Sequence, residues 1–551
     1  MASFWQNKTE MTGCGDKRNA PQNILSKGVS CTATKTKIED ADLLNSQNEL
    51  ERAYRIYKDI LGKDPSQADA LFGIGVILEK QKKFDLAIQF FSRAIKSDPD
   101  KLQALLARGR IFRLQGIPAR ALADFTEVIS NSPDHFEALI ARGITLGQTG
   151  QFNLAIDDFS LAIRVNSNCA EAFYNRGVVY EKLYEFEAAI KDYSIAIKLN
   201  PNDFKAYNNR GVARREIRCF DSALKDFDKS IEIKPDFAEG HYNKSLTLLS
   251  VGKLKDGFKL YEHRWKTAHF RSQRRHFPQP LWHGNEDLTG KTILLHSEQG
   301  LGDSIQFCRY IKFFENMKCR VLLEIEQPLI SLMQCLLPHE YIYRKGSTLP
   351  AFDFHCPLMS LPHSFGTTLN DIPFSGPYLA VHQKRIEHWR KLLKKKDKPI
   401  IGLAWRGNPH HVNDQRRSSG LIEIIGSLSK EFEWISLERF PTEHEKHLID
   451  KKGHMRQFGD EIGDFAETAA LCKAIDAVIS VDTSTAHLAA SIGTETHLLL
   501  RDCADWRWLQ GRKDTPWYNA IKIYRRLDKD RWLSVLKAAQ FSIATSHNTN
   551  A

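Results

Sequence analysis

Two polar loops, each directly after an apolar stretch, carry residue types that could hold an anion and move a proton. The first loop follows residues 292–296 and contains Gly300, Gly302 and Asp303. Its glycines leave room for a ligand near the backbone, and a helix that starts there would offer N–H groups to an anion. Asp303 could accept a proton in this position. Alternatively, it only caps the helix that begins near Ser304.

The second loop follows the apolar residues 478–481. It contains Asp482, Thr483 and Ser484, with His487 one helical turn later. Backbone N–H groups and hydroxyls at the start of a helix can cradle a diphosphate. The alternative is that Thr483 and Ser484 are helix caps and that His487 is a hydrogen-bonded helix histidine.

The elements around these loops follow an alternating pattern. From residue 290 onward, short apolar runs alternate with helical stretches, which is typical of βα units in a parallel sheet. The predicted strands form two sets: 292–296, 320–325, 341–343 and 352–356, then 400–405, 433–437, 477–481, 496–500 and 521–524. The sequence therefore predicts two Rossmann-like lobes, with ligands at the carboxyl ends of the strands.

A repeat of 34 residues precedes the α/β region. Its recurring positions are Pro65, Pro99, Pro133, Pro201 and Pro235 (Ser167 in the missing slot), then Gly75, Gly109, Gly143, Gly177 and Gly211, then Ala87, Ala121, Ala155, Ala189 and Ala223, and finally Phe91, Phe125, Phe159, Tyr193 and Phe227. Small residues let two helices approach, the aromatic ring fills the space between helix pairs, and proline ends the second helix.

This repeat resembles the tetratricopeptide repeat family and predicts an α-solenoid. Five full copies cover 68–237, a partial copy precedes them (Ala53, Tyr57), and a degenerate copy follows (Ser245, Gly257, Tyr261).

A solenoid usually binds a partner on its concave face, often an extended peptide. The repeat stacks three amides, Asn175, Asn209 and Asn243, which could pair with a peptide backbone. One position further lies a basic row: Arg108, Arg142, Arg176, Arg210 and Lys244. Alternatively, both sets are repeat-consensus residues that bond neighbouring helices within the solenoid.

The composition is that of an ordinary globular protein, with 42% apolar and 26% charged residues. The formal net charge is +11, but eight basic residues crowd 384–398, which fits a solvated helix or linker better than a nucleic-acid groove. The ten cysteines are scattered without a CxxC pair, as expected for reduced thiols. No apolar run approaches the roughly 18 residues of a membrane span. The sequence therefore predicts a cytoplasmic protein with no membrane span and no nucleic-acid partner.

These patterns divide the chain into six parts. They are a disordered tail (1–40), the repeat solenoid (41–265), a connector (266–289), a first α/β lobe (290–383), a basic inter-lobe linker (384–398) and a second lobe (399–545). The tail is predicted because it is polar and lacks any period.

The α/β part resembles the family 9 glycosyltransferases, the heptosyltransferase-like group, and most closely bacterial proteins that fuse such a domain to tetratricopeptide repeats. The resemblance rests on Gly-Leu-Gly-Asp at 300–303, Ile-Gly-Leu-Ala-Trp at 401–405 and Asp-Thr-Ser-Thr-Ala-His-Leu-Ala at 482–489, and it covers nearly all of 280–535. It implies a GT-B fold and inverting transfer from a nucleotide-diphosphate sugar without a metal or other cofactor. It also implies that Asp303 is the base.

The same resemblance implies a set of donor contacts. Asp482, Thr483, Ser484 and His487 would hold the donor phosphates, beside Gly300 and Gly302. The family's lysine after the first strand of the second lobe has no clear counterpart, and Arg406 and His411 are the candidates for donor-binding cations in that loop.

The sequence thus favours a sugar transferase whose solenoid presents a protein acceptor. The alternative is a non-catalytic, peptide-binding adaptor whose transferase domain has lost activity, whereas a nucleotide-sugar epimerase lacks a supporting motif. No metal site is expected. Asp226-Phe227-Asp228 is a DxD only by letters, because Phe227 is a repeat packing position, and His444 and His447 lack a third ligand.

Overall fold

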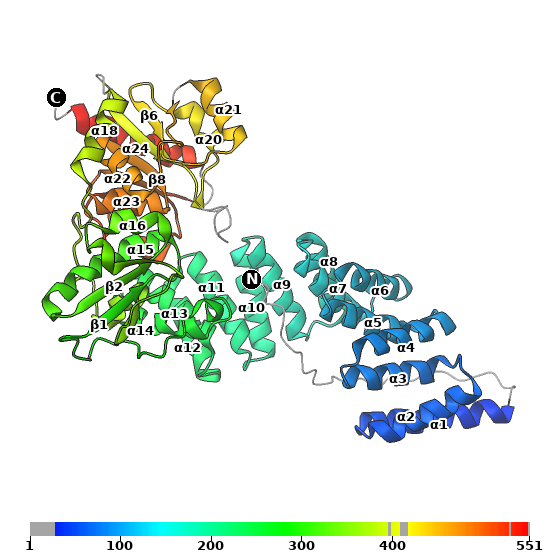
Figure 1. Ribbon diagram of the computed structural model, residues 1–551. Helices are drawn as coiled ribbons and strands as arrows, with labels where there is room; N and C mark the ends of the chain where they lie inside the picture. Colours follow the sequence, from blue (N-terminus) through cyan, green and yellow to red (C-terminus); the bar gives the residue numbers. More distant parts are fainter. Residues whose placement is uncertain (1–27, 395–397, 408–416, 454, 528–530, 549–551) are drawn as a thin grey trace. The chain divides into compact units, whose positions relative to one another are not determined.

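The computed structural model describes residues 28–394, 398–407, 417–453, 455–527 and 531–548 (Figure 1). The chain divides into two compact units, Met1–Ile217 and Arg218–Ala551. From residue 28 onward the first unit is built of helices alone, and the described part of the second unit combines helices with two parallel sheets.

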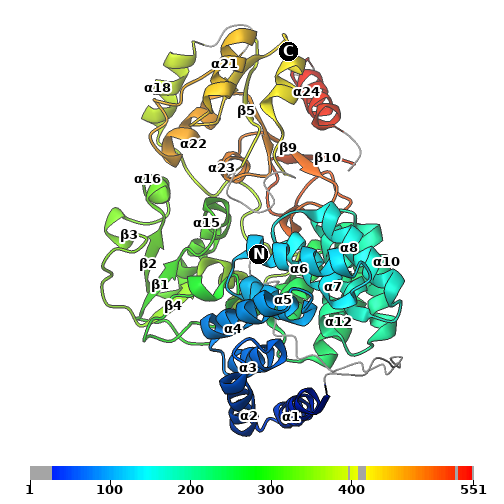
Figure 2. The same cartoon turned by 90° about the vertical axis from the view of Figure 1, so that its right-hand side faces the viewer.

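The helices of the first unit pack in succession, each against the next (Figure 2). They are α1 (Gly28–Ser46), α2 (Leu50–Lys63), α3 (Ala68–Lys80), α4 (Phe84–Ser97), α5 (Leu102–Leu114), α6 (Pro118–Asn131), α7 (Phe136–Gln148), α8 (Phe152–Val165), α9 (Ala170–Lys182), α10 (Phe186–Leu199) and α11 (Phe204–Glu216). The predicted helical solenoid is confirmed here.

The repeat positions explain why these helices pair closely. A Cβ atom on Gly75 would lie 2.4 Å from the ring of Phe91, and one on Gly109 would lie 2.6 Å from the ring of Phe125. Both rings are fully buried, and burial of such a side chain stabilises the fold by about 1.5–3 kcal/mol. Only glycine leaves room for the ring in each pair.

Helix α1 corrects the predicted tail. Because α1 begins at Gly28, the prediction of disorder over 1–40 is wrong for 28–40. Ile38 and Ala41 are buried in one cluster with Tyr57 of α2. This packing outweighs the weak helix propensity of the threonine-rich start of α1. Residues 1–27 lie outside the described part of the chain.

The second unit begins with the last repeat helices, α12 (Phe220–Ile233), α13 (Ala238–Ser250) and α14 (Leu254–Tyr261), followed by the 3₁₀ turn η2 (Glu262–Lys266). Phe258 of α14 is fully buried, with its ring 6.4 Å from that of Phe307 and 5.4 Å from that of Trp506. The predicted boundary at 265 is therefore misplaced, because the end of the repeats shares a hydrophobic core with the α/β region.

Two parallel sheets follow. The first has the order β3-β2-β1-β4 and the second β10-β9-β8-β5-β6-β7. Their strands are β1 (Thr292–His296), β2 (Arg320–Ile325), β3 (Ile342–Arg344), β4 (Phe354–Pro357), β5 (Ile400–Ala404), β6 (Glu433–Ser436), β7 (Met455–Arg456), β8 (Ala477–Val481), β9 (Thr496–Arg501) and β10 (Ile521–Arg526). All nine predicted strands are confirmed within two residues at each end, and β7 was not predicted.

Helices connect and flank these strands. They are α15 (Leu301–Phe307), α16 (Ile330–Met333), α17 (Leu361–Ser364), α18 (Gln383–Leu393), α20 (Leu421–Ile424), α21 (Glu443–Lys452), α22 (Phe465–Ala474), α23 (Ser484–Ser491) and α24 (Trp532–Asn548), together with the 3₁₀ segments η4 (Cys308–Met317) and η9 (Trp506–Trp508).

Helix α18 corrects the predicted basic linker at 384–398. It packs against α22 and buries Trp389 completely, and the Trp389 indole donates a hydrogen bond to Glu467. The lysines and arginines of this stretch therefore belong to an amphipathic helix of the second lobe. Residues 395–397 lie outside the described part. Among the described helices, none combines the length and apolar character needed to cross a membrane.

Candidate functional site

The two polar loops predicted from the sequence meet in the second unit. Helix α15 follows β1, helix α23 follows β8, and the two helices pack directly against each other. A Cβ atom on Gly302 would lie 3.0 Å from the imidazole of His487 and 3.5 Å from the Cα of Ser484. The room that Gly302 provides is therefore used for this close approach of the two helices.

Asp303 is held from two sides. Its Oδ2 accepts a hydrogen bond from the N–H of Gly300 at 2.8 Å, so it does cap α15, which begins at Leu301 rather than near Ser304. Its Oδ1 accepts a hydrogen bond from Nη2 of Arg507. The carboxylate is consequently ion-paired, and its side chain is 20% exposed.

Arg507 is a site residue to which sequence reasoning gave no role. It is buried and also donates to Asp505 at 2.9 Å and to Gln306 at 2.7 Å. Burial alone would lower the pKa of Arg507, but Asp505 and Asp303 raise it above the ordinary value. Arg507 therefore stays charged and ties η9 to the start of α15. The only signal in the sequence was that its segment, Asp505-Trp506-Arg507-Trp508, lies within the stretch 280–535 that carries the family resemblance.

The start of α23 has no side-chain cap. Thr483 occupies the cap position, but its side chain makes no capping hydrogen bond; its hydroxyl lies 3.1 Å from that of Ser480. Thr483 and Ser484 are both partly exposed. The N–H groups of Ala486 and His487 bond to the carbonyl of Thr483, so the donors that the Thr483 side chain leaves uncapped are those of Ser484 and Thr485.

Asp482 precedes this helix. Burial and the nearby Asp505 raise the pKa of Asp482 to about 6, whereas Arg417 and Arg507 act in the opposite direction. The position of Arg417 near Asp482 makes it a candidate cation for a bound phosphate, one that the sequence did not single out.

His487 is buried and neutral. Burial, followed by the charges of Arg507 and Arg309, lowers its pKa well below the ordinary value. Its Nδ1 lies 2.9 Å from the hydroxyl of Tyr518, and its ring stacks on Trp508 at 5.0 Å. In the structure, His487 thus fills the junction of α15 and α23.

Of the two predicted donor-binding cations, the structure describes Arg406. Nη2 of Arg406 donates to the carbonyl of Phe440 at 2.9 Å, and its guanidinium lies 3.1 Å from the carboxylate of Glu445 on α21. His411 lies outside the described residues. Both partners of Arg406 therefore belong to the second lobe, and one of them, Glu445, lies on α21.

The asparagine ladder lies largely inside the repeats. Asn175 and Asn209 are 6% and 2% exposed. The amide of Asn209 donates to the hydroxyl of Tyr174 at 3.1 Å and accepts from Asn208 at 3.0 Å. These contacts favour the packing alternative for Asn209. Asn243 is partly buried in α13 of the second unit.

The basic row of the first unit links neighbouring repeats. Three arginines each form a bidentate ion pair with a buried aspartate of the same repeat. The pairs are Arg108–Asp124, Arg142–Asp158 and Arg176–Asp192, with nitrogen–oxygen distances of 2.7–3.0 Å. Each also donates to a hydroxyl of the preceding repeat, on Ser92, Thr126 and Ser160 respectively. These arginines therefore bond neighbouring helices, as the packing alternative predicted.

A metal site is not seen in the part of the chain that the structure describes, which contains no group of three or more His, Cys, Asp or Glu side chains placed to hold an ion. The DxD letters at 226–228 fall within α12, where Asp226 is buried and Asp228 pairs with Lys244.

Comparison with known proteins identifies relatives of limited coverage. The Protein FlbA of Caulobacter vibrioides is 24% identical over 317 residues, which are 51% of each chain. The chain thus spans about half the length of this curated relative. Among solved structures, MamA is 28% identical (30% of this chain, 97% of that chain, TM-score 0.29), and YrrB, described as a tetratricopeptide repeat protein with an unusual peptide-binding site, is 19% identical (34% and 98%, TM-score 0.32). PilF of Pseudomonas aeruginosa is 18% identical (38% and 96%, TM-score 0.35).

The comparison with protein families concerns the repeats. Two family models described as tetratricopeptide repeat match residues 40–101, 91–136 and 170–203. All three matches fall in the first unit, which contains the paired helices and the glycine–aromatic contacts of the repeat. The first unit of this chain is therefore built of tetratricopeptide repeats.

Proposed function

We propose that the second unit is a glycosyltransferase with a GT-B fold, which moves a sugar from a nucleotide-diphosphate donor to an acceptor without a metal ion. The observation that carries this proposal is the packing of α15 on α23, because it brings a carboxylate and an uncapped helix start to the same junction. Sugar transfer needs both a proton acceptor and a group that stabilises the departing diphosphate.

The residues of the junction take complementary roles in such a transfer. The acceptor oxygen attacks the anomeric carbon, the bond from that carbon to the diphosphate oxygen breaks, and Asp303 takes the acceptor's proton. Arg507 contacts this carboxylate and holds it at the start of α15. The N–H groups of α23, the hydroxyls of Thr483 and Ser484, and the cation of Arg417 stabilise the leaving diphosphate.

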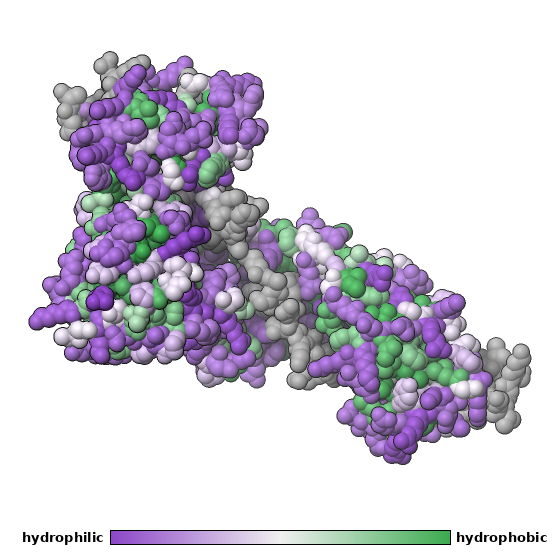
Figure 3. Space-filling view, in the orientation of Figure 1, coloured by the Kyte–Doolittle hydropathy of each residue, from purple (hydrophilic) through white to green (hydrophobic). Residues whose placement is uncertain are grey.

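The acceptor is a protein or peptide in this proposal. Tetratricopeptide repeats form an extended surface suited to a polypeptide. In the first unit, apolar side chains gather over the region of α3 to α5 (Figure 3). Large apolar residues exposed in that region include Leu86 at 45% and Leu114 at 63%. A surface of this kind suits an amphipathic segment of a partner.

Donor binding tests the proposal most directly. We expect purified protein to be stabilised against heat by at least one nucleotide-diphosphate sugar, and Thr483→Ala with Ser484→Ala to weaken that binding in calorimetry. The fold should persist, because Thr483 makes no capping bond. A control, Thr442→Ala, removes a side chain that does cap a helix, α21, and should cost stability without changing donor affinity.

A non-catalytic adaptor is the second candidate. The observation in its favour is that both oxygens of Asp303 already have protein partners. An adaptor would bind peptides through its repeats but would show no donor stabilisation and no release of nucleoside diphosphate. If no nucleotide sugar of a full panel stabilises the protein or releases nucleoside diphosphate, the adaptor is favoured over the transferase.

A further inference from the structure

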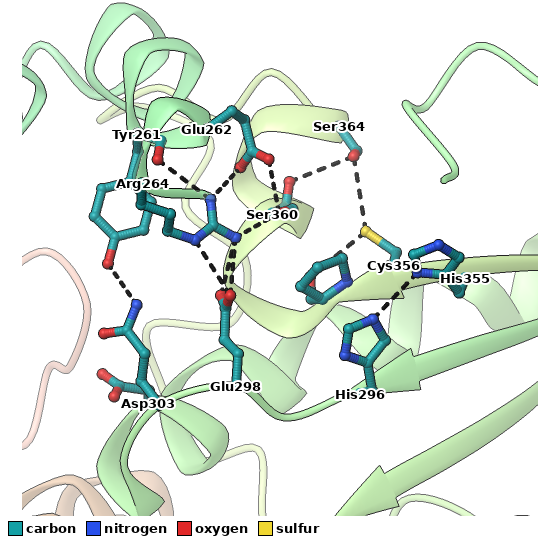
Figure 4. A network of polar contacts seen from close by, with 12 residues as sticks. Tyr261, Glu262, Arg264, His296, Glu298, Asp303, His355, Cys356, Ser360 and Ser364 are labelled. Carbon is teal, nitrogen blue, oxygen red and sulfur yellow. Dashed lines mark hydrogen bonds and ion pairs between the residues drawn. The ribbon is translucent and has the colours of Figure 1, made fainter. Parts of the chain in front are cut away.

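Arg264 is buried completely at the junction between the last repeat and the first lobe (Figure 4). It belongs to η2, directly after α14, and its guanidinium carbon lies 4.8 Å from the ring centre of Tyr261 and 4.3 Å from that of Trp265. An arginine side chain without solvent contact is rare and needs partners for its donors.

All three guanidinium nitrogens of Arg264 donate hydrogen bonds. Nε and Nη2 hold the carboxylate of Glu298 at 3.0–3.2 Å. Nη2 also donates to Ser360 at 2.8 Å, and Nη1 donates to Glu262 at 2.6 Å. Ser360 in turn donates to Glu262 at 3.1 Å, which closes the network.

Glu298 lies in the loop that leads to Asp303. Its neighbours in that loop are anchored as well: Gln299 donates to the hydroxyl of Tyr261 at 2.9 Å, and Ser297 donates to Glu326 at 2.8 Å. Two consecutive loop side chains, Glu298 and Gln299, are thus fixed by the last repeat helix and the turn after it. The next residue, Gly300, is the one whose N–H binds Asp303.

We propose that Arg264 is a positioning residue: it makes the end of the repeat solenoid set the conformation of the loop that carries Gly300 and Asp303. This inference rests on the proposed function, in which that loop supplies the base. It assigns the last repeat a structural part in catalysis, in addition to the binding of a partner by the first unit. A small displacement of such a loop is enough to slow a reaction strongly.

Glu298→Gln in the full-length chain is the sharpest test. This change keeps the shape of the side chain and leaves Glu262 as the carboxylate partner of Arg264, but it replaces one of the two oxygens that Arg264 holds with an amide NH2. We therefore expect the fold to remain intact. We expect faster amide hydrogen exchange in 297–303, a fall in kcat of about tenfold to a hundredfold, and a donor KM within about twofold of the parent.

Two further variants make the result specific. Arg264→Lys keeps the charge but cannot reach Glu298 and Ser360 together, and it should loosen the same loop. Glu467→Gln removes a carboxylate that pairs with Arg385 in the second lobe and should leave exchange in 297–303 unchanged.

Unchanged exchange in 297–303 for both Glu298→Gln and Arg264→Lys would overturn the proposal, as would parental kcat in an active enzyme. Exchange is measured without substrate, so it tests the anchoring even if no transfer is detected, an outcome that would count against the proposed function alone. Faster exchange in 297–303 than in the Glu467→Gln control would support the anchor.

Discussion

At the scale of single residues, Asp303 carries the most specific prediction. Asp303→Asn keeps the size of the side chain and one oxygen that can accept from the N–H of Gly300, so the cap of α15 should persist, while the amide NH2 replaces the oxygen that Arg507 binds. A general base typically contributes 10²–10⁴-fold to the rate, or roughly 3–5 kcal/mol. We expect single-turnover transfer to slow by about this factor, with donor affinity unchanged in calorimetry.

The control for this prediction is Asp505→Asn, which removes the other carboxylate that Arg507 binds but leaves the loop alone. Its rate should stay within a few fold of the parent. If Asp303→Asn also stays within a few fold, Asp303 is a cap and an ion-pair partner only.

The residues that sequence reasoning found and missed differ in one physical respect. Asp303 and Ser484 were found because each follows an apolar strand, and a strand end followed by a helix start is visible in local sequence. Arg507 and Arg264 were missed because their partners, Asp303 and Glu298, lie far away along the chain. Spacing carries no information about such pairs.

At the scale of secondary structure elements, the arginine–aspartate pairs of the first unit predict a stability cost. Asp158 is buried, and Arg142→Met would leave its carboxylate without a cation. We expect the first unit to lose about 3 kcal/mol of unfolding free energy. Arg110→Met removes a partner of the more exposed Glu137 and should cost no more than about 1 kcal/mol. Urea denaturation followed by far-ultraviolet circular dichroism measures both, and equal losses would contradict the difference.

Some boundaries of strands and helices can be predicted from the local sequence pattern alone, and others cannot. The strands β1 and β2 were predicted with their observed ends because apolar runs with polar flanks mark a buried strand. The two-residue strand β7 is too short to leave a pattern. Helix α18 was taken for a linker because its basic face dominates the composition, while only Ile386, Trp389 and Leu393 are buried.

At the scale of the whole molecule, the two units should respond to pH in opposite directions. In the first unit, burial raises the pKa of Glu181 to about 7 and also raises those of Glu79 and Glu171. The unfolded chain then loses protons near pH 4.5 that the folded unit keeps, so stability falls as pH rises toward 7.

In the second unit, burial lowers the pKa values of several histidines: His263, His296, His355, His363, His487 and His497. The unfolded chain binds more protons below pH 6.5, so these groups make stability rise with pH up to that value. Glu298 and Asp482 act the other way, because burial raises their pKa values to about 7 and about 6, but they are fewer.

The sequence provides separate probes for this test. Nine of the ten tryptophans lie at position 265 or later, and the tenth is Trp5. Tryptophan fluorescence therefore follows the second unit, whereas circular dichroism at 222 nm is weighted toward the helical first unit. Between pH 5 and 6.5 we expect the fluorescence midpoint in urea to rise and the helical midpoint to fall. Glu181→Gln should reduce the fall of the helical midpoint with pH. If both midpoints of the parent protein shift in the same direction, the opposite pH responses of the two units are contradicted.

Truncation tests where the α/β folding unit begins. A boundary drawn from repeat counting would start the α/β part at residue 266, but Leu254, Phe258 and Tyr261 are buried in the same hydrophobic cluster as the first sheet. Arg264 adds the ionic network to Glu298. A fragment of 218–551 retains these side chains, whereas a fragment of 266–551 exposes their apolar partners to water and removes the cation of Glu298.

We therefore expect the 218–551 fragment to unfold cooperatively with native-like tryptophan fluorescence, and the 266–551 fragment to be unfolded or aggregated, since a domain has roughly 5–15 kcal/mol in total to lose. The intermediate fragment 251–551 separates the loss of the Arg264 ion pair from the loss of apolar contacts made by the repeat helices. It keeps α14 and Arg264 but lacks α12 and α13, whose Leu249 belongs to the shared core. Cooperative folding of 266–551 would show that the last repeat is only attached to the α/β region, and Arg264 would then lose its role in setting the loop at Gly300.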